Sequence, residues 1–304
     1  FFLRTVAKKE AEFDPADCPA IIAIQFATIR DVLGDNHIKA LLMVNVEVLS
    51  SKRILESDHY FRNHFRLSFN LLLDALFTLE AIWSVSYASS KHQLNFPVVA
   101  DDAILSVAGC YHLLLKDPVK NDLSLAPDHN IMFLSGANMA GKSTYLRSIA
   151  TIVCLAHAGF PVPVTAASIP FYNEIYVCIT LKDSLLKGYS HFYNEILQIK
   201  RLMGALQEGK NCFAVFDEVL NGTNVKDAQA CCTIMLQKLK GYPHSLVLLS
   251  SHNLELSAEA SHDHVMYSHL EVLLNDEQPV FTYKLKGGKN EISLGLRLFR
   301  QLGL

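Results

Sequence analysis

The stretch Gly136–Thr144 restricts the fold of this chain more than any other. It reads Gly-Ala-Asn-Met-Ala-Gly-Lys-Ser-Thr and matches the phosphate-binding pattern G-x-x-x-x-G-K-S/T at every fixed position. The apolar run 131–134 before it suits a buried strand, and residues 145–158 after it suit a helix. The pattern thus has the strand–loop–helix context that it needs, and we expect an α/β domain around it.

The residue types of this loop predict a particular chemistry. The two glycines let the backbone turn so that successive N–H groups face one anion at the positive end of the helix. Lys142 is expected to reach the β- and γ-phosphates of a nucleotide, and Ser143 to offer its hydroxyl to Mg²⁺. The residues expected to bind the nucleotide are Gly136, Ala137, Asn138, Met139, Ala140, Gly141, Lys142, Ser143 and Thr144.

A second element is the apolar run 212–216, which ends in Asp217 and Glu218. An acidic pair at a strand end is a weak signal alone, because such residues often only cap a helix. Combined with the phosphate loop, it predicts a Walker B element. Asp217 would then hold the Mg²⁺ shell, and Glu218 would polarise the attacking water.

A third element is His252, which follows the apolar run 246–249 and Ser250-Ser251. The C-terminal ends of strands form the ligand-binding edge of such a sheet, so His252 is expected to sense the γ-phosphate and orient the water. The alternative is that it is one of thirteen histidines, placed at a surface turn. The expected catalytic residues are Glu218, His252 and Lys142.

Two regions differ in pattern. Residues 1–100 look helical, and 60–88 predict one long helix whose apolar and aromatic face packs in a core. Residues 101–304 alternate short apolar runs with helical stretches, which predicts a sheet with helices on its faces. The expected strands cover 131–135, 174–180, 212–217, 245–250, 263–268 and 280–286, and the expected helices cover 142–157, 190–208, 226–239 and 292–301.

Composition narrows the class of protein. The 304 residues carry a net charge of −3, and basic and acidic side chains are nearly balanced in both regions, so neither is a basic nucleic-acid footprint. No apolar run approaches a membrane span, and early charges argue against a signal peptide. The seven cysteines lack C-x-x-C spacing, which favours reduced core thiols in a cytoplasmic protein. Because position 1 is Phe, we expect a piece of a longer protein.

Taken together, these motifs resemble the MutS family of DNA mismatch-repair ATPases. Residues 135–147 resemble T-G-P-N-M-G-G-K-S-T-Y-L-R, and 217–224 are similar to D-E-I-G-R-G-T-S. Residues 250–256 resemble T-T-H-Y-x-E-L, and 183–195 resemble D-D-L-x-x-G-x-S-T-F-x-x-E. The resemblance covers 105–304 strongly, with a looser likeness to the end of a lever helix in 76–88.

This resemblance implies a P-loop NTPase domain of ABC type, with a mixed sheet flanked by helices, preceded by an all-α lever-like segment. It implies ATP and Mg²⁺ as cofactors, with Ser143 and Asp217 on the metal and Asn138 at the γ-phosphate edge. Ser190 would complete the site of a neighbouring protomer. We therefore expect a homodimer through the ATPase domains that acts as a nucleotide-gated clamp on double-stranded or structured DNA.

The chain also departs from the family pattern. Ala137 and Ala140 replace Pro and Gly, Asn221 replaces a basic residue, and 118–122 lack the aromatic residue expected to stack on adenine. About 100 residues precede the ATPase, too few for mismatch-reading, connector and full lever domains. The chain is thus a fragment of a repair protein or a divergent relative with another task, and the loose likeness of 1–75 favours the second.

Two other functions compete with this interpretation. The near-neutral charge of residues 1–100 suits an ATP-gated interaction module whose target is not DNA, such as a membrane- or ribosome-associated complex. An ABC transporter subunit is disfavoured, because its L-S-G-G-Q signature is missing and Gly188-Tyr189-Ser190 fits the MutS pattern instead.

Overall fold

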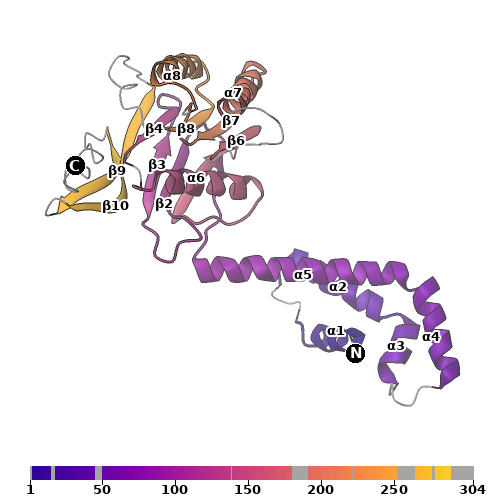
Figure 1. Cartoon of the computed structure of the whole chain (residues 1–304). Coiled ribbons are helices and arrows are strands. Elements are labelled where there is room, and N and C mark those ends of the chain that lie inside the picture. Colours follow the sequence, from indigo (N-terminus) through magenta and orange to yellow (C-terminus); the bar gives the residue numbers. More distant parts are fainter. Residues whose placement is uncertain are drawn as a thin grey trace. The chain divides into compact units, whose positions relative to one another are not determined.

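The computed structural model describes residues 2–14, 18–44, 50–137, 139–179, 191–220, 222–251, 264–275 and 278–288. Its contacts divide the chain into two compact units, Phe1–Ser90 and Lys91–Leu304 (Figure 1).

The first unit is helical. Asp35 caps one of its helices by accepting hydrogen bonds from the backbone N–H groups of His37, at 2.8 Å, and Ile38, at 3.1 Å. A small core gathers side chains from several helices, among them Ile29, Ile38, Phe65 and Leu72. The helices are α1 (Phe2–Ala11), α2 (Ala20–Leu33), α3 (Asn36–Met43), α4 (Ser51–Asn63) and α5 (Arg66–His92).

The single long helix expected over 60–88 is wrong at its start, because the chain turns between α4 and α5. The Tyr60 carbonyl accepts hydrogen bonds from the N–H groups of both His64 and Phe65, which ends α4. Phe65 is only 2% exposed and packs in the small core. Burial of an aromatic ring is stabilising, and Phe65 is buried at this turn. A continuous helix would remove the turn.

The apolar face of α5 does not form the core that its sequence suggested. Leu72 and Ala75 are buried, but Trp83 is 66% exposed and stacks on neighbouring Tyr87. Within the described part of the chain, α5 is the helix whose length and apolar composition would allow a membrane crossing. Core helices of water-soluble proteins meet the same criteria. The other large exposed side chains on α5 are Leu67, Phe69, Leu71 and Phe77.

The alternating pattern predicted a sheet flanked by helices, and the second unit contains one. It is a mixed sheet of six strands in the order β10-β9-β4-β8-β7-β6 (Figure 1). All neighbours are parallel except β10 and β9, which form an antiparallel pair at one edge. The expected helix over 292–301 lies outside the described residues. The strands are β4 (Ile131–Ser135), β6 (Glu174–Cys178), β7 (Cys212–Phe216), β8 (Leu246–Ser250), β9 (Val265–Asn275) and β10 (Gln278–Gly287).

The three central strands β4, β7 and β8 are buried along their whole length. Alternate side chains enter two different cores, so that Met132 and Leu134 face one core while Ile131 and Phe133 face the other. Helix α6 (Lys142–His157) fills the first core, and α7 (His191–Gln207) and α8 (Val225–Leu239) fill the second. Burial on both faces explains why these strands read as continuous apolar runs.

A second sheet, which the sequence analysis did not predict, contributes to the first core. It has the order β1-β5-β2-β3, with β1 (Val98–Ala100), β2 (Leu105–Cys110), β3 (Asn121–Leu125) and β5 (Ala166–Pro170). Leu105, Val107 and Leu123 pack against α6 side chains in that core. This sheet and α6 thus share the first core.

All seven cysteines lie in the described part of the chain and are free there. Cys110, Cys178, Cys212 and Cys232 are buried, whereas Cys154 and Cys231 are exposed. Burial raises the pKa of Cys178 and of Cys212 to about 11, so both remain protonated thiols near neutral pH.

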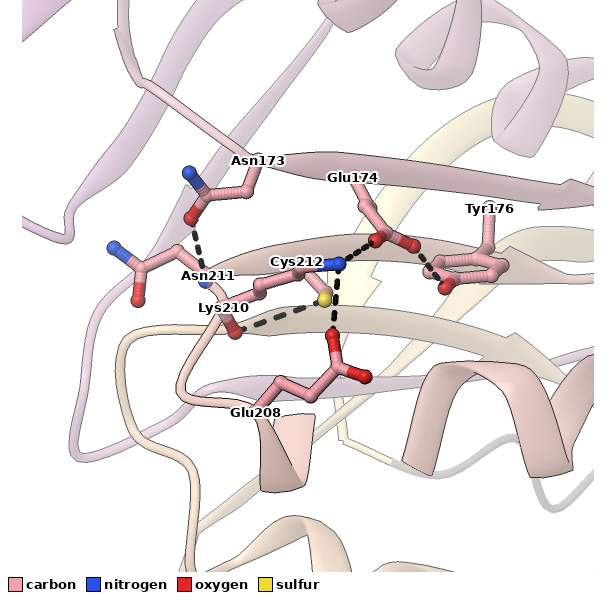
Figure 2. A network of polar contacts seen from close by, with 7 residues as sticks. All are labelled: Asn173, Glu174, Tyr176, Glu208, Lys210, Asn211 and Cys212. Carbon is pink, nitrogen blue, oxygen red and sulfur yellow. Dashed lines mark hydrogen bonds and ion pairs between the residues drawn. The ribbon is translucent and has the colours of Figure 1, made fainter. Parts of the chain in front are cut away.

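A polar network fastens the first residues of β6 to the turn before β7, at the sheet edge where both strands begin (Figure 2). The Lys210 ammonium lies 2.6 Å from Glu174 Oε1 and 2.9 Å from Glu208 Oε2. The Tyr176 hydroxyl donates to the second Glu174 oxygen. Hydrogen bonds from Lys210 and Tyr176 lower the pKa of Glu174 below its usual value of 4.5.

This network predicts a pH-dependent contribution to stability. Because the folded pKa of Glu174 is lowered, its contribution is present above about pH 4.5 and is lost as pH falls through the folded pKa. Glu174→Gln should lower the midpoint of urea unfolding at about pH 7, and its difference from the wild type should shrink at about pH 3. Glu208→Gln is the control and should have a smaller effect, since Glu208 is 66% exposed. A difference that is constant over this pH range would contradict the assignment.

Candidate functional site

The loop between β4 and α6 has the backbone that an anion site requires. Gly136 has φ 142°, Met139 has φ 69° and Gly141 has φ 98°. Gly141 is the N-cap residue of α6, so the loop leads into the positive end of a helix of 16 residues. The Ala140 N–H donates to the Ala137 carbonyl at 3.2 Å, which closes the turn. Unpaired N–H groups at such a helix start are donors for phosphate oxygens.

Gly141 is required here for two reasons. Its positive φ is a conformation that side-chain-bearing residues rarely adopt. A Cβ at this position would also lie 3.1 Å from Cδ1 of Tyr283, which packs over the loop from β10. In contrast, Ala140 is 1% exposed within the first core, so alanine fits where the family pattern has glycine.

Lys142 is the buried cation of the site. It is 6% exposed, and its Nζ donates to the carbonyls of Gly136, at 2.7 Å, and Ala137, at 3.1 Å. Burial lowers the pKa of Lys142, and the negative charges of Glu218 and then Asp217 act in the opposite direction. These two carboxylates therefore lie within electrostatic range of the ammonium, although they come from a different strand.

Asp217 and Glu218 follow β7 and are held by the end of β8. Ser250 Oγ donates to Asp217 Oδ1 at 2.6 Å and accepts from the Glu218 N–H at 2.8 Å. The N–H of Val219 donates to the Ser250 carbonyl at 3.0 Å. The carboxylate pair is thus fixed to the strand that lies between β7 and β4.

The turn that carries this pair is strained. Glu218 has φ 55° and Leu220 has φ 61°, and a left-handed conformation costs a residue with a side chain about 1–2 kcal/mol. The buried Glu195 of α7 compensates for part of this cost, since its Oε1 accepts from the Leu220 N–H at 2.9 Å. Backbone strain of this kind concentrates at functional sites.

A cavity of about 600 Å³ opens beside the loop. Its lining includes Ala137, Met139–Thr144 and Glu218, which are predicted site residues. The lining also includes Tyr111, His112, Pro118 and Val119, which are not among the predicted site residues. Phosphate-binding groups and partly aromatic, apolar side chains in one cavity match the two halves of a nucleotide.

Tyr111 is the residue that sequence reasoning missed. Its ring lies under Lys120 Nζ, 5.6 Å from the ring centroid, and its hydroxyl donates to the His92 carbonyl. The family pattern has its adenine-stacking aromatic residue in the stretch that corresponds to 118–122, where this chain has none. The signal that could have found Tyr111 is its position directly after β2, a strand that was not predicted.

Three predicted site residues lie outside the described part of the chain. These are Asn138 in the loop, Ser190 before α7 and His252 after β8. Their roles stay predictions.

The residues around the loop fit a magnesium ion. Among the described residues no cluster of three or more His, Cys, Asp or Glu side chains could form a protein-only metal cage. The oxygen donors near the loop are instead Ser143, which lines the cavity, and Asp217, which acts on the buried Lys142. Few protein ligands beside phosphate oxygens are the usual coordination of Mg²⁺ in such sites.

Comparison with known proteins agrees with this geometry. The sequence model of MutS domain V matches residues 132–304. The DNA mismatch repair protein MutS of Streptococcus sanguinis (strain SK36) is 28% identical over 240 residues, which cover 77% of this chain and 28% of that protein. The DNA mismatch repair protein HexA of Streptococcus pneumoniae (strain ATCC BAA-334 / TIGR4) is 27% identical over the same shares.

The chain therefore spans little more than a quarter of the length of these relatives. The matched domain nevertheless covers more than half of the chain and includes the loop before α6, the acidic pair after β7 and the end of β8. The chain belongs to the MutS family.

Proposed function

We propose that this chain binds ATP with Mg²⁺ in the cavity beside the loop and hydrolyses it. The observation that carries the proposal is the arrangement of a buried lysine, an anion-binding helix start and two carboxylates at one edge of a parallel sheet. The lysine and the helix start come from the segment after β4, and the two carboxylates come from the segment after β7. All are of the type that phosphoryl transfer to water uses.

In this function the loop N–H groups and Lys142 bind the phosphates, while Ser143 and Asp217 hold the metal. Mg²⁺ would neutralise charge that develops on the phosphate oxygens. Glu218 orients a water molecule and accepts its proton, helped by its fixed backbone. We also propose that His252 senses the γ-phosphate and that Asn138 lies at its edge.

The nucleoside would lie at the other end of the cavity, against Tyr111. An aromatic ring offers a stacking face to a planar base, and the neighbouring Pro118 and Val119 add apolar contact. This placement would compensate for the missing aromatic residue in 118–122.

We further assign the second unit to the ABC-type P-loop NTPases and propose that it works as a dimer, with Ser190 completing the partner's site. The position of β8 between β4 and β7 supports the fold assignment, because it brings the loop and the carboxylates to one edge. The names of the MutS and HexA relatives support a role in DNA mismatch repair or a related DNA transaction. In that role we propose that the chain acts as a nucleotide-gated clamp.

Steady-state ATP hydrolysis across a protein titration tests the dimer and the DNA target together. Turnover per chain should rise with protein concentration, because each site needs a residue from a second protomer. It should also change with one of homoduplex, mismatched or branched DNA. Turnover that responds to no DNA form would favour a target other than DNA and would exclude the clamp.

Glu218→Gln tests the catalytic assignment. The substitution removes the proton acceptor but keeps the shape, so turnover should fall by about 10²–10⁴-fold while ATP still binds. Lys142→Ala is the matched comparison and should weaken ATP binding itself, because it removes the cation at the phosphates. Equilibrium binding of a fluorescent ATP analogue and phosphate release would separate the two effects. Undiminished turnover in Glu218→Gln would refute its role.

Tyr111→Ala tests the nucleoside end of the cavity. Stacking of a base on an aromatic ring contributes about 1–3 kcal/mol, so ATP affinity should fall by about 5- to 150-fold. Binding of inorganic tripolyphosphate, which has no base, should be unchanged, as measured by calorimetry. Equal losses for both ligands would instead indicate a general disturbance of the cavity.

A further inference from the structure

Ser250 is the last residue of strand β8. It lies at the edge of the sheet where the phosphate loop and the acidic pair meet. In the sheet β8 lies between β4 and β7, with Ser250 paired to Leu134 and Leu249 paired to Phe216. The segment after Leu134 leads into the phosphate loop, and the segment after Phe216 begins with Asp217. Ser250 is fully buried, so water does not compete for its hydroxyl.

The directions of the hydrogen bonds at Ser250 are fixed by chemistry. A backbone N–H can only donate, so the hydroxyl must accept from the N–H of Glu218, at 2.8 Å. Its single proton is then directed to Asp217 Oδ1, at 2.6 Å. One hydroxyl therefore orients the side chain of one acidic residue and the main chain of the next.

The main-chain contact matters because Glu218 has a left-handed φ of 55°. Such a conformation persists only where surrounding contacts hold it. The Ser250 carbonyl adds a third contact by accepting from Val219 N–H at 3.0 Å, and this contact does not depend on the serine side chain. Removing the hydroxyl alone would therefore release Asp217 and Glu218 while β8 stays attached to the turn.

We propose that Ser250 is a positioning residue for the ATPase reaction. Its hydroxyl sets the Asp217 carboxylate for Mg²⁺ and the Glu218 backbone for the attacking water. This role rests on the proposed function. A residue that orients a metal ligand typically changes metal affinity or activity by about 10–100-fold when it is removed.

The chain contains a matched control at the opposite end of the same two strands. Ser245 is also buried, and its Oγ accepts from the N–H of Cys212 at 2.8 Å. Ser245 thus joins the start of β8 to the start of β7 by the same type of bond that Ser250 makes at their ends. Ser245→Ala should cost comparable stability without touching the site.

The test compares the full 304-residue chain with Ser250→Ala, Ser250→Thr and Ser245→Ala. ATP affinity is measured in MgCl₂ and in EDTA, turnover is measured against MgCl₂ concentration, and thermal unfolding monitors the fold. Ser250→Ala should lose about 10–100-fold in turnover and in the gain of ATP affinity that Mg²⁺ provides. Its ATP affinity in EDTA should stay unchanged.

Ser250→Thr keeps the hydroxyl, so it should restore most of the turnover and most of the gain of ATP affinity that Mg²⁺ provides. Ser245→Ala should resemble the wild type in these two quantities. Wild-type values in Ser250→Ala would overturn the proposal, and so would equal losses in Ser245→Ala. If the threonine variant does not fold, the comparison of the two alanine variants decides.

The same data separate this inference from the proposed function. A wild-type chain that binds no ATP would overturn both. A wild-type chain whose ATP affinity rises with Mg²⁺ but that shows no turnover would overturn only the hydrolytic function. The comparison of ATP affinity in MgCl₂ and in EDTA would then still decide whether the Ser250 hydroxyl positions Asp217.

Discussion

Burial of β4, β8 and β7 on both faces is the constraint on which the site depends. Because these strands are parallel neighbours packed between two cores, their carboxyl ends must meet at one edge of the sheet. The phosphate loop leaves from β4, the acidic pair from β7 and Ser250 from β8. The chemistry is therefore assembled by the sheet order rather than by proximity in sequence.

A second constraint acts on the turn after β7, which is held from two sides. On one side the end of β8 contacts Asp217 and the two residues after it. On the other side, Glu195 of α7 accepts a hydrogen bond from the N–H of Leu220. Gly222 lies so close to α7 that a Cβ added to it would be 2.8 Å from Cβ of Phe192. The first turn of α7 directly follows the segment that contains Ser190. The strained turn thus packs against the first residues of α7.

Much of this candidate site could be predicted from the sequence, because short local patterns indicate its elements. The strand before Gly136, the helix after it and the acidic pair after Phe216 each depend on neighbouring residues, and the structure has all of these elements. The sheet β1-β5-β2-β3 was not predicted, because its strands are short and half exposed, so their apolar runs are weak. Tyr111 was missed with it, since its place in the cavity follows from β2.

The packing of the first unit could not be predicted from the sequence in the same way. An apolar helical face predicts burial only if another surface covers it, and periodicity does not say which surface that is. The break at Phe65 and the exposure of Trp83 both depend on how few residues form the small core. The pattern was therefore correct about a helix over 66–88 but wrong about its start and about its packing.

Charge bears on how such a chain could act on DNA. Affinity for DNA that comes from phosphate contacts needs clustered cations and falls steeply with salt. This chain has 27 basic and 30 acidic residues, so its overall field does not attract a polyanion. A clamp of the kind proposed would therefore have to rely on a local patch, or on parts of a larger assembly. Under the proposed function, this chain would contribute ATP-driven movement rather than electrostatic attachment.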